Sequence, residues 1–190
     1  MSKLFFFDVE TTGTRHWRHS VHQISGCIEI DGEVKEYFDI RCQPYHAAEI
    51  DPAALEISGT SMEAIKGYMP FKDAYRVILK MLGKYVNKFN KKDKFFLVGF
   101  NNASFDNHFF RAFFVQNLDD YFGSWFWSSS IDVMVMATQY LMRRRHDMVN
   151  FKLMTVAAAL GIKVDENKLH DAQYDIDLTR SIYKIVTAGK

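Results

Sequence analysis

The feature that most constrains the fold is a short apolar run near the N-terminus that stops at two carboxylates. Residues 3–7 read Lys-Leu-Phe-Phe-Phe and precede the polar segment 8–13, a pattern that predicts a buried first β-strand. Because side chains alternate along a strand, Asp8 and Glu10 point to the same face of the sheet. Ligands bind beyond the carboxyl ends of strands in open α/β sheets, so this acidic pair is a candidate site. An Asp-x-Glu pair is also common on ordinary protein surfaces.

The order of the other elements predicts an α/β fold. Asp31-Gly32 separates two apolar segments, 23–30 and 34–40, which predicts a hairpin and an antiparallel meander after the first strand. A further buried strand is predicted at 95–100. Apolar residues at helical spacing predict helices at 71–89, from the turn at 101–104 through Phe114, and at 131–141, 152–160 and 171–186. We therefore expect one domain, residues 1–190, with a mixed sheet of about five strands flanked by helices.

Composition defines the class of protein more than its task. The 190 residues are 48% hydrophobic and 25% charged, as in soluble globular proteins, and the net charge of +1 gives no overall signature of a polyanionic partner. Cys27 and Cys42 are too few for a disulfide framework. No apolar segment is long enough for a signal peptide or a membrane span, so we expect a cytoplasmic protein with no membrane partner.

Two further segments place acidic residues close to predicted element ends. Asp106 follows the turn at 101–104, where a carboxylate can also serve only to offset a helix dipole. His170 lies five residues before Asp175, and at about 3.6 residues per turn the two would not share one face of a helix. We therefore expect His170 in a loop, Asp171 as the helix N-cap and Asp175 on the helix.

Taken together, these segments resemble the three motifs of the DEDDh 3′-5′ exonucleases. The matching segments, in the family's order, are Asp8-Val9-Glu10-Thr11-Thr12-Gly13, Asn102-Ala103-Ser104-Phe105-Asp106 and His170-Asp171-Ala172-Gln173-Tyr174-Asp175. The superfamily includes the proofreading subunit of bacterial DNA polymerase III, oligoribonuclease and ribonuclease T. The resemblance runs from Leu4 to about Ile185 and implies a ribonuclease H-like fold with a mixed five-stranded sheet.

The resemblance also implies a role for each motif residue. It assigns metal binding to four carboxylates and the role of general base to a histidine: Asp8, Glu10, Asp106, Asp175 and His170. Hard divalent cations prefer carboxylate oxygens, so the implied cofactors are two Mg²⁺ or Mn²⁺ ions. The residues implied to contact the substrate are Thr11, Thr12 and Asn102.

The implied activity is the release of nucleoside 5′-monophosphates from 3′ ends of single-stranded DNA or RNA. Two alternatives stay open. A ribonuclease H-like endonuclease would share the acids on the first strand without needing the pair His170 and Asp175, and an inactive nucleic-acid-binding module would need no metal. Only 15 residues follow Asp175, most of them in the same predicted helix, so we see no tail that would tether a polymerase and expect a free-standing exonuclease; a polymerase partner and a dimer both remain open.

Two segments are candidates for contact with the nucleic-acid strand. A basic patch consists of Arg143, Arg144, Arg145 and Lys152, and the aromatic segment Trp125-Phe126-Trp127 lies upstream of it. Charge and stacking surface together would suit a nucleic-acid strand. Equally, an arginine run is typical of a solvated turn and paired tryptophans are typical of a core.

Overall fold

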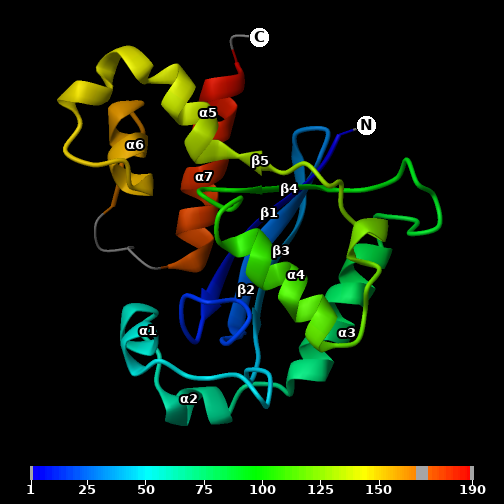
Figure 1. The fold of residues 1–190 in the computed structure, drawn as a ribbon. Helices are drawn as coiled ribbons and strands as arrows, with labels where there is room; N and C mark the ends of the chain where they lie inside the picture. The colour runs from blue at the N-terminus through cyan, green and yellow to red at the C-terminus, as the bar shows by residue number, and fades with distance from the viewer. Residues whose placement is uncertain (1, 166–170, 189–190) are drawn as a thin grey trace.

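The computed structural model describes residues 2–165 and 171–188, which form a five-stranded sheet with helices on both faces (Figure 1). The strands are β1 (Lys3–Thr11), β2 (Val21–Ile30), β3 (Glu33–Arg41), β4 (Phe96–Gly99) and β5 (Ile131–Asp132), in the spatial order β3-β2-β1-β4-β5. Strands β1 to β3 are antiparallel, whereas β4 runs parallel to β1 and β5 parallel to β4. The predicted mixed sheet, with its antiparallel meander first, is confirmed.

The helices divide between the two faces of the sheet. They are α1 (Pro52–Ile57), α2 (Met62–Lys66), α3 (Phe71–Gly83), α4 (Asp106–Gln116), α5 (Val133–Tyr140), α6 (Leu153–Ala159) and α7 (Ala172–Thr187), with short 3₁₀ helices η1 (Phe122–Ser124) and η2 (Met142–Asp147). Helices α3 and α4 pack into one core, and α5, α6 and α7 pack into a second core on the opposite face. No helix among residues 2–165 and 171–188 is long and apolar enough to cross a membrane.

Strand β1 belongs to both cores because its side chains alternate. Phe5 and Phe7 are buried in the core with α3 and α4, and Phe6 is buried in the core with α5, α6 and α7. Asp8 and Glu10 continue the series of Phe6 by the period of two. The two carboxylates therefore lie on the face that α7 covers.

The predicted hairpin turn is confirmed. Asp31 and Gly32 have φ angles of 50° and 87°, the left-handed conformation that a two-residue turn needs and that the Asp-Gly pair tolerates.

The aromatic segment upstream of the basic patch is mainly core. Trp125 and Phe126 are buried, and the ring of Phe126 lies 5.5 Å from the ring of Phe110 on α4. These two side chains are therefore not available as stacking surface for a nucleic acid.

Several elements differ from the prediction. The helix predicted at 71–89 ends at Gly83, a residue of low helix propensity. The helix predicted at 131–141 is preceded by β5, which has only two residues and so leaves no periodic pattern. Helices α1 and α2 were not predicted, because six and five residues are too few for a helical repeat. Their starts carry ordinary signals, since Asp51 and Ser61 each cap a helix N-terminus.

Candidate active site

Four carboxylates reach one region from three elements. Asp8 and Glu10 lie at the carboxyl end of β1, Asp106 is the first residue of α4, and Asp175 lies in the first turn of α7. Helix α7 begins where expected, because the side chain of Asp171 accepts a hydrogen bond from the backbone N–H of Tyr174 at 3.0 Å. This cap sets the position of Asp175 on its helix.

A direct hydrogen bond links two of these elements. The backbone N–H of Val9, between Asp8 and Glu10, donates to Oδ1 of Asp106 at 3.1 Å. Asp106 is only 5% exposed, so this bond satisfies a carboxylate that has little access to water. The bond fixes the start of α4 against β1.

The turn before Asp106 is held by a residue that the sequence analysis did not single out. Asp132, at the end of β5, accepts hydrogen bonds from the backbone N–H groups of Asn101, Ala103 and Met134 at 3.0, 3.3 and 2.9 Å. The Asp132 side chain thus both caps α5 and anchors the β4–α4 turn. Its position at the start of the helix predicted at 131–141, where an acidic side chain can cap the N-terminus, was the one available signal.

Burial and mutual repulsion raise the pKa values of two acids in the cluster. The pKa of Asp8 is raised well above its ordinary value, first by burial and then by the charges of Asp106, Glu10 and Asp175. Burial also raises the pKa of Asp106 to about 7, although hydrogen bonds from the backbone N–H groups of Val9 and of Asp106 itself oppose the shift. Bound positive charge would therefore relieve an unfavourable concentration of negative charge.

The chemistry of the donors suits a hard divalent cation. Carboxylate oxygens are the ligands that Mg²⁺ and Mn²⁺ prefer, and the cluster is made of carboxylates. A cavity of about 150 Å³ opens beside it, lined by Phe7, Asp8, Phe100, Leu153, Asp175, Ile176 and Thr179. In the part of the chain that the structure describes, no three His, Cys, Asp or Glu side chains already form a metal-binding group. The carboxylate oxygens and the raised pKa values fit the binding of a cation. The described side chains are not arranged as a complete set of metal ligands.

The two threonines of the first motif hold the backbone together. Oγ1 of Thr11 donates to the carbonyl of Gly13 at 2.7 Å, and Oγ1 of Thr12 donates to the carbonyl of Glu49 at 2.7 Å. The Thr12 hydroxyl also accepts from the N–H of Ser20 at 3.0 Å. Both side chains are buried, so their contact with substrate stays a prediction.

Asn102 is buried beneath the β4–α4 turn. Its Nδ2 donates to Oδ1 of Asn107 at 3.3 Å, while its Oδ1 has no hydrogen-bond partner among the described residues. Its contact with substrate likewise stays a prediction. His170 lies outside the described residues, which resume at Asp171.

Comparison with known proteins decides the family. The model of the RNase_T family, described as an exonuclease family, matches residues 5–183. The chain belongs to the RNase_T exonuclease family. This confirms the predicted exonuclease superfamily, and with it the prediction that the chain is an exonuclease.

Individual members of the RNase_T family resemble the chain over most of its length. Ribonuclease T of Photorhabdus laumondii is 26% identical over 187 residues, which cover 93% of this chain and 79% of that protein. The 3′-5′ DNA exonuclease Cap18 of Escherichia coli is 28% identical over 183 residues, covering 94% of this chain and 90% of that protein.

Solved structures show the same fold. Escherichia coli exonuclease I in complex with a dT13 oligonucleotide matches with a TM-score of 0.76 and 23% identity, over 98% of this chain and 41% of that chain. The zinc-bound form of the exonuclease I complex with single-stranded DNA matches with a TM-score of 0.78 and 22% identity, over 100% of this chain and 41% of that chain. This chain thus spans about two fifths of exonuclease I, and the ribonuclease H-like fold is confirmed.

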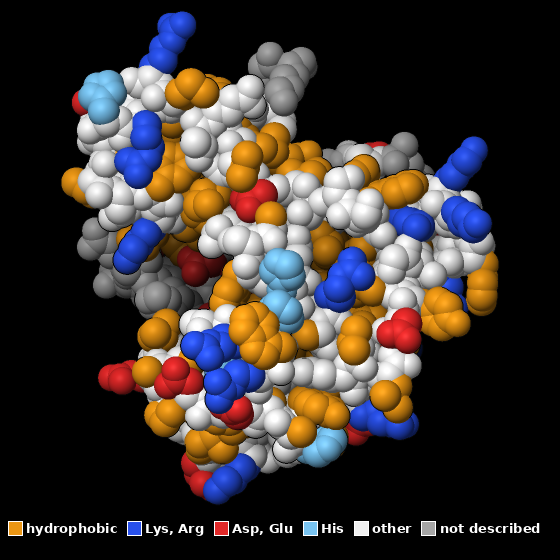
Figure 2. Space-filling view, in the orientation of Figure 1, with side chains coloured by type: hydrophobic (Ala, Val, Ile, Leu, Met, Phe, Trp, Pro, Cys, Tyr) orange, Lys and Arg blue, Asp and Glu red, His pale blue; other side chains and the backbone are white. Residues whose placement is uncertain are grey.

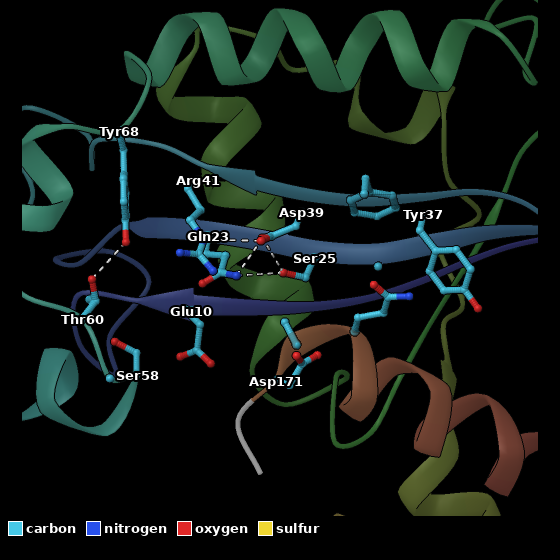
Figure 3. A pocket seen from close by; sticks show the side chains of 15 residues that line it. Glu10, Gln23, Ser25, Tyr37, Asp39, Arg41, Ser58, Thr60, Tyr68 and Asp171 are labelled. Carbon is cyan, nitrogen blue, oxygen red and sulfur yellow. Dashed lines mark hydrogen bonds and ion pairs between the residues drawn. The ribbon is translucent and has the colours of Figure 1, made fainter. Parts of the chain in front are cut away.

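In this RNase_T-family chain a polar groove extends from the acidic cluster across the sheet (Figure 3). It has a volume of about 580 Å³, and its floor follows from the strand register. Gln23 on β2 lies opposite Glu10, and Arg41 on β3 lies opposite Gln23. The side chains of Glu10 and Asp171 point into the groove in Figure 3.

A second cross-strand row completes the floor. Ser25 lies opposite Asp8, and Asp39 lies opposite Ser25. Oδ1 of Asp39 accepts hydrogen bonds from Nε2 of Gln23 at 2.7 Å and from Oγ of Ser25 at 3.0 Å (Figure 3). The sequence analysis missed this groove, because only the pairing of β2 and β3 with β1 shows that these polar residues share the face of the carboxylates.

Two arginines of the basic patch donate hydrogen bonds to backbone carbonyls. On η2, Arg144 donates to the carbonyl of Ala159 at 3.0 Å, and Arg145 donates to the carbonyl of Met148 at 3.2 Å. Lys152 immediately precedes Leu153, which lines the cavity beside the carboxylates. Among the four residues of the basic patch, Lys152 is therefore the one nearest in sequence to a residue that lines this cavity.

Proposed function

We propose that this chain removes nucleoside 5′-monophosphates from the 3′ ends of single-stranded DNA or RNA, in a hydrolysis that depends on divalent cations. The observation that carries the proposal is the convergence of Glu10, Asp106 and Asp175 on the partly buried Asp8, close enough to raise its pKa. Membership of an exonuclease family supports the reaction class. The names of the related proteins support the polarity, since one of them is a 3′-5′ DNA exonuclease.

The four carboxylates would together hold two divalent cations, Mg²⁺ or Mn²⁺. When bound, these ions supply charge stabilisation on the attacking and leaving oxygens of a phosphodiester and favour deprotonation of water. The chain's own part is to hold the acids in position. Val9 does so for Asp106 through its N–H, and the Asp171 cap does so for Asp175 through the start of α7.

His170 is proposed as the general base. An imidazole titrates near neutral pH, which suits it to accept a proton from the attacking water. Its place in the chain supports this role, because it directly precedes the Asp171 that caps α7. Replacing His170 with Ala should lower kcat by more than about 100-fold while Mn²⁺ binding persists. Loss of Mn²⁺ binding in calorimetry would instead make His170 a ligand.

The proposal is tested by trimming a 5′-labelled single-stranded oligonucleotide. We expect a ladder that shortens one nucleotide at a time from the 3′ end, with release of nucleoside 5′-monophosphates and complete inhibition by chelator. Asp8→Asn should abolish the ladder. Asp73→Asn is the matched control, because Asp73 is an exposed acid on α3 that pairs with Arg76. Equal activity of the Asp8→Asn and wild-type proteins would refute the proposal.

The same assay separates the alternatives. Cleavage of a circular single strand, or internal fragments in place of a ladder, would identify an endonuclease. Oligonucleotide binding without any cleavage in Mg²⁺ or Mn²⁺ would identify a non-catalytic module. Parallel reactions with single-stranded DNA, double-stranded DNA and short RNA would then define the substrate.

A further inference from the structure

The loop between β1 and β2 is fixed at both ends. It follows the first motif directly, and the N–H of Thr12 donates to the carbonyl of Ser20 at 2.8 Å across its base. Inside the loop, the N–H of Arg15 donates to Nδ1 of His19 at 3.0 Å. The N–H of Glu49, from the segment before α1, donates to the carbonyl of Arg18 at 2.8 Å. Side chains on this loop therefore project from an anchored backbone.

At the tip of this loop a tryptophan faces solvent. Trp17 is 70% exposed, whereas Trp125 is 5% exposed and belongs to the core. The indole contacts the imidazole of His16 edge-on, with ring centroids 5.0 Å apart and an angle of 88° between the planes. An exposed indole on an anchored loop offers a flat apolar surface that the fold itself does not use.

The loop that carries this tryptophan rests on helix α4. The ring of His16 stacks on the ring of His108 at 5.0 Å and 16°, and it meets the ring of Phe109 edge-on at 6.2 Å. His108 is on the first turn of α4, two residues after Asp106. The loop thus rests on the same helical turn that brings Asp106 to β1.

The surroundings of the indole are cationic. Arg15 and Arg18 flank it in sequence, and both are exposed. Arg18 makes a two-point ion pair with Glu49, at 2.9 and 2.6 Å, whereas Arg15 makes no ion pair among the described residues. Burial and the charge of His108 lower the pKa of His16, whose ring adds aromatic surface beside the indole.

The space-filling view shows where side chains of these types gather on one face of the molecule. On the face seen in Figure 2, histidine, hydrophobic and Lys or Arg side chains gather next to a recess in which acidic side chains are visible. Aromatic faces beside positive charge are the combination that holds single-stranded nucleic acids, since bases stack and phosphates are attracted.

We propose that Trp17 is a stacking platform for a base of the single-stranded substrate, outside the carboxylate cavity, with Arg15 facing the sugar-phosphate backbone. The inference rests on the proposed function, because it assumes a nucleic-acid strand in the site. Stacking on an indole tolerates any base, so the platform raises affinity for the strand without selecting a sequence. It acts on binding and leaves the chemistry to the carboxylates.

The test compares steady-state kinetics on a 5′-labelled oligothymidylate. Trp17→Ala should raise KM by about tenfold, the loss expected for one base–aromatic stack, and leave kcat nearly unchanged. Trp17→Phe, which keeps an aromatic face, should restore most of the affinity. Phe89→Ala is the matched control, because Phe89 is an 86% exposed aromatic residue in the α3–β4 connection and should not alter KM.

An abasic scan identifies the stacked nucleotide. A single abasic site at that nucleotide should raise KM for the wild-type protein and add nothing further for Trp17→Ala. An unchanged KM in active Trp17→Ala protein would overturn the inference. So would an increase in KM from Trp17→Ala that is the same on every substrate, whichever nucleotide is abasic. If the wild-type protein itself produces no ladder, the proposed function fails, and that outcome is distinct from both of these.

Discussion

The N–H of Val9 donates a 3.1 Å hydrogen bond to Oδ1 of Asp106, so the strand that carries two of the carboxylates also holds the third. Replacing Asp106 with Asn keeps an oxygen for this bond and removes a buried charge. The raised pKa of Asp106 means that its contribution to stability is complete below its ordinary pKa near 4 and is lost as the pH rises through about 7.

We therefore expect metal-free wild-type protein to lose stability between pH 5 and 8 more steeply than Asp106→Asn. At pH 8 the variant should be more stable by on the order of 2 kcal/mol, measured by urea unfolding in chelator. Asp106→Ala, which leaves the Val9 N–H without its acceptor, should be about 1 kcal/mol less stable than Asp106→Asn at both pH values. Parallel pH curves for wild type and Asp106→Asn would contradict the raised pKa.

Metal binding should strengthen as the pH rises, whereas the stability of the metal-free protein should fall. Protons compete with cations for Asp8 and Asp106, whose pKa values are both raised. The increase in melting temperature on adding Mn²⁺ should consequently be larger at pH 8 than at pH 6. Asp8→Asn should lose most of this increase, and the Asp73→Asn control should keep it. An increase that is independent of pH would mean that the cation binds elsewhere.

The parts of the site that the sequence predicted are those defined by local rules. Asp8 and Glu10 share a face because strands alternate, and Asp171 caps α7 because its side chain can reach the N–H of Tyr174. Both relationships span a few residues, so the order of amino acids is enough to find them.

The parts that the sequence did not predict depend on contacts between distant segments. Gln23 joins the face of Glu10 only through the pairing of β2 with β1, and Arg41 joins it through a second pairing. Trp17 comes close to α4 through the stack of its neighbour His16 on His108, two residues that are far apart in the chain. No local pattern encodes such a register or stack.

Asp132 should be a positioning residue for the second motif. Asp132→Ala removes the acceptor for three backbone N–H groups, those of Asn101, Ala103 and Met134. Loss of the helix cap and of the turn bonds should destabilise the protein by about 2 to 3 kcal/mol. Asp132→Asn, which retains one accepting oxygen, should lose about half as much. Chemical unfolding measures both values, and equal stability of Asp132→Ala and wild type would show that the turn is held by other contacts.

The buried ion pair between α7 and β2 should be the most sensitive polar contact outside the site. Arg180 donates to Oε2 of Glu29 at 2.6 Å, with side chains 12% and 4% exposed, and its guanidinium also lies 5.9 Å from the ring centroid of Phe6. Arg180→Met should destabilise the protein by about 3 kcal/mol, because the Glu29 carboxylate is left buried without its partner.

Adding Glu29→Met to Arg180→Met should recover most of that loss, since the buried charge is then gone and apolar side chains fill the space. The four proteins of this double-mutant cycle, compared by urea unfolding at one pH, give the coupling between the two residues directly. Additive effects would show that the two charges do not depend on each other, and that the ion pair does not hold α7, with Asp175 on it, to the sheet.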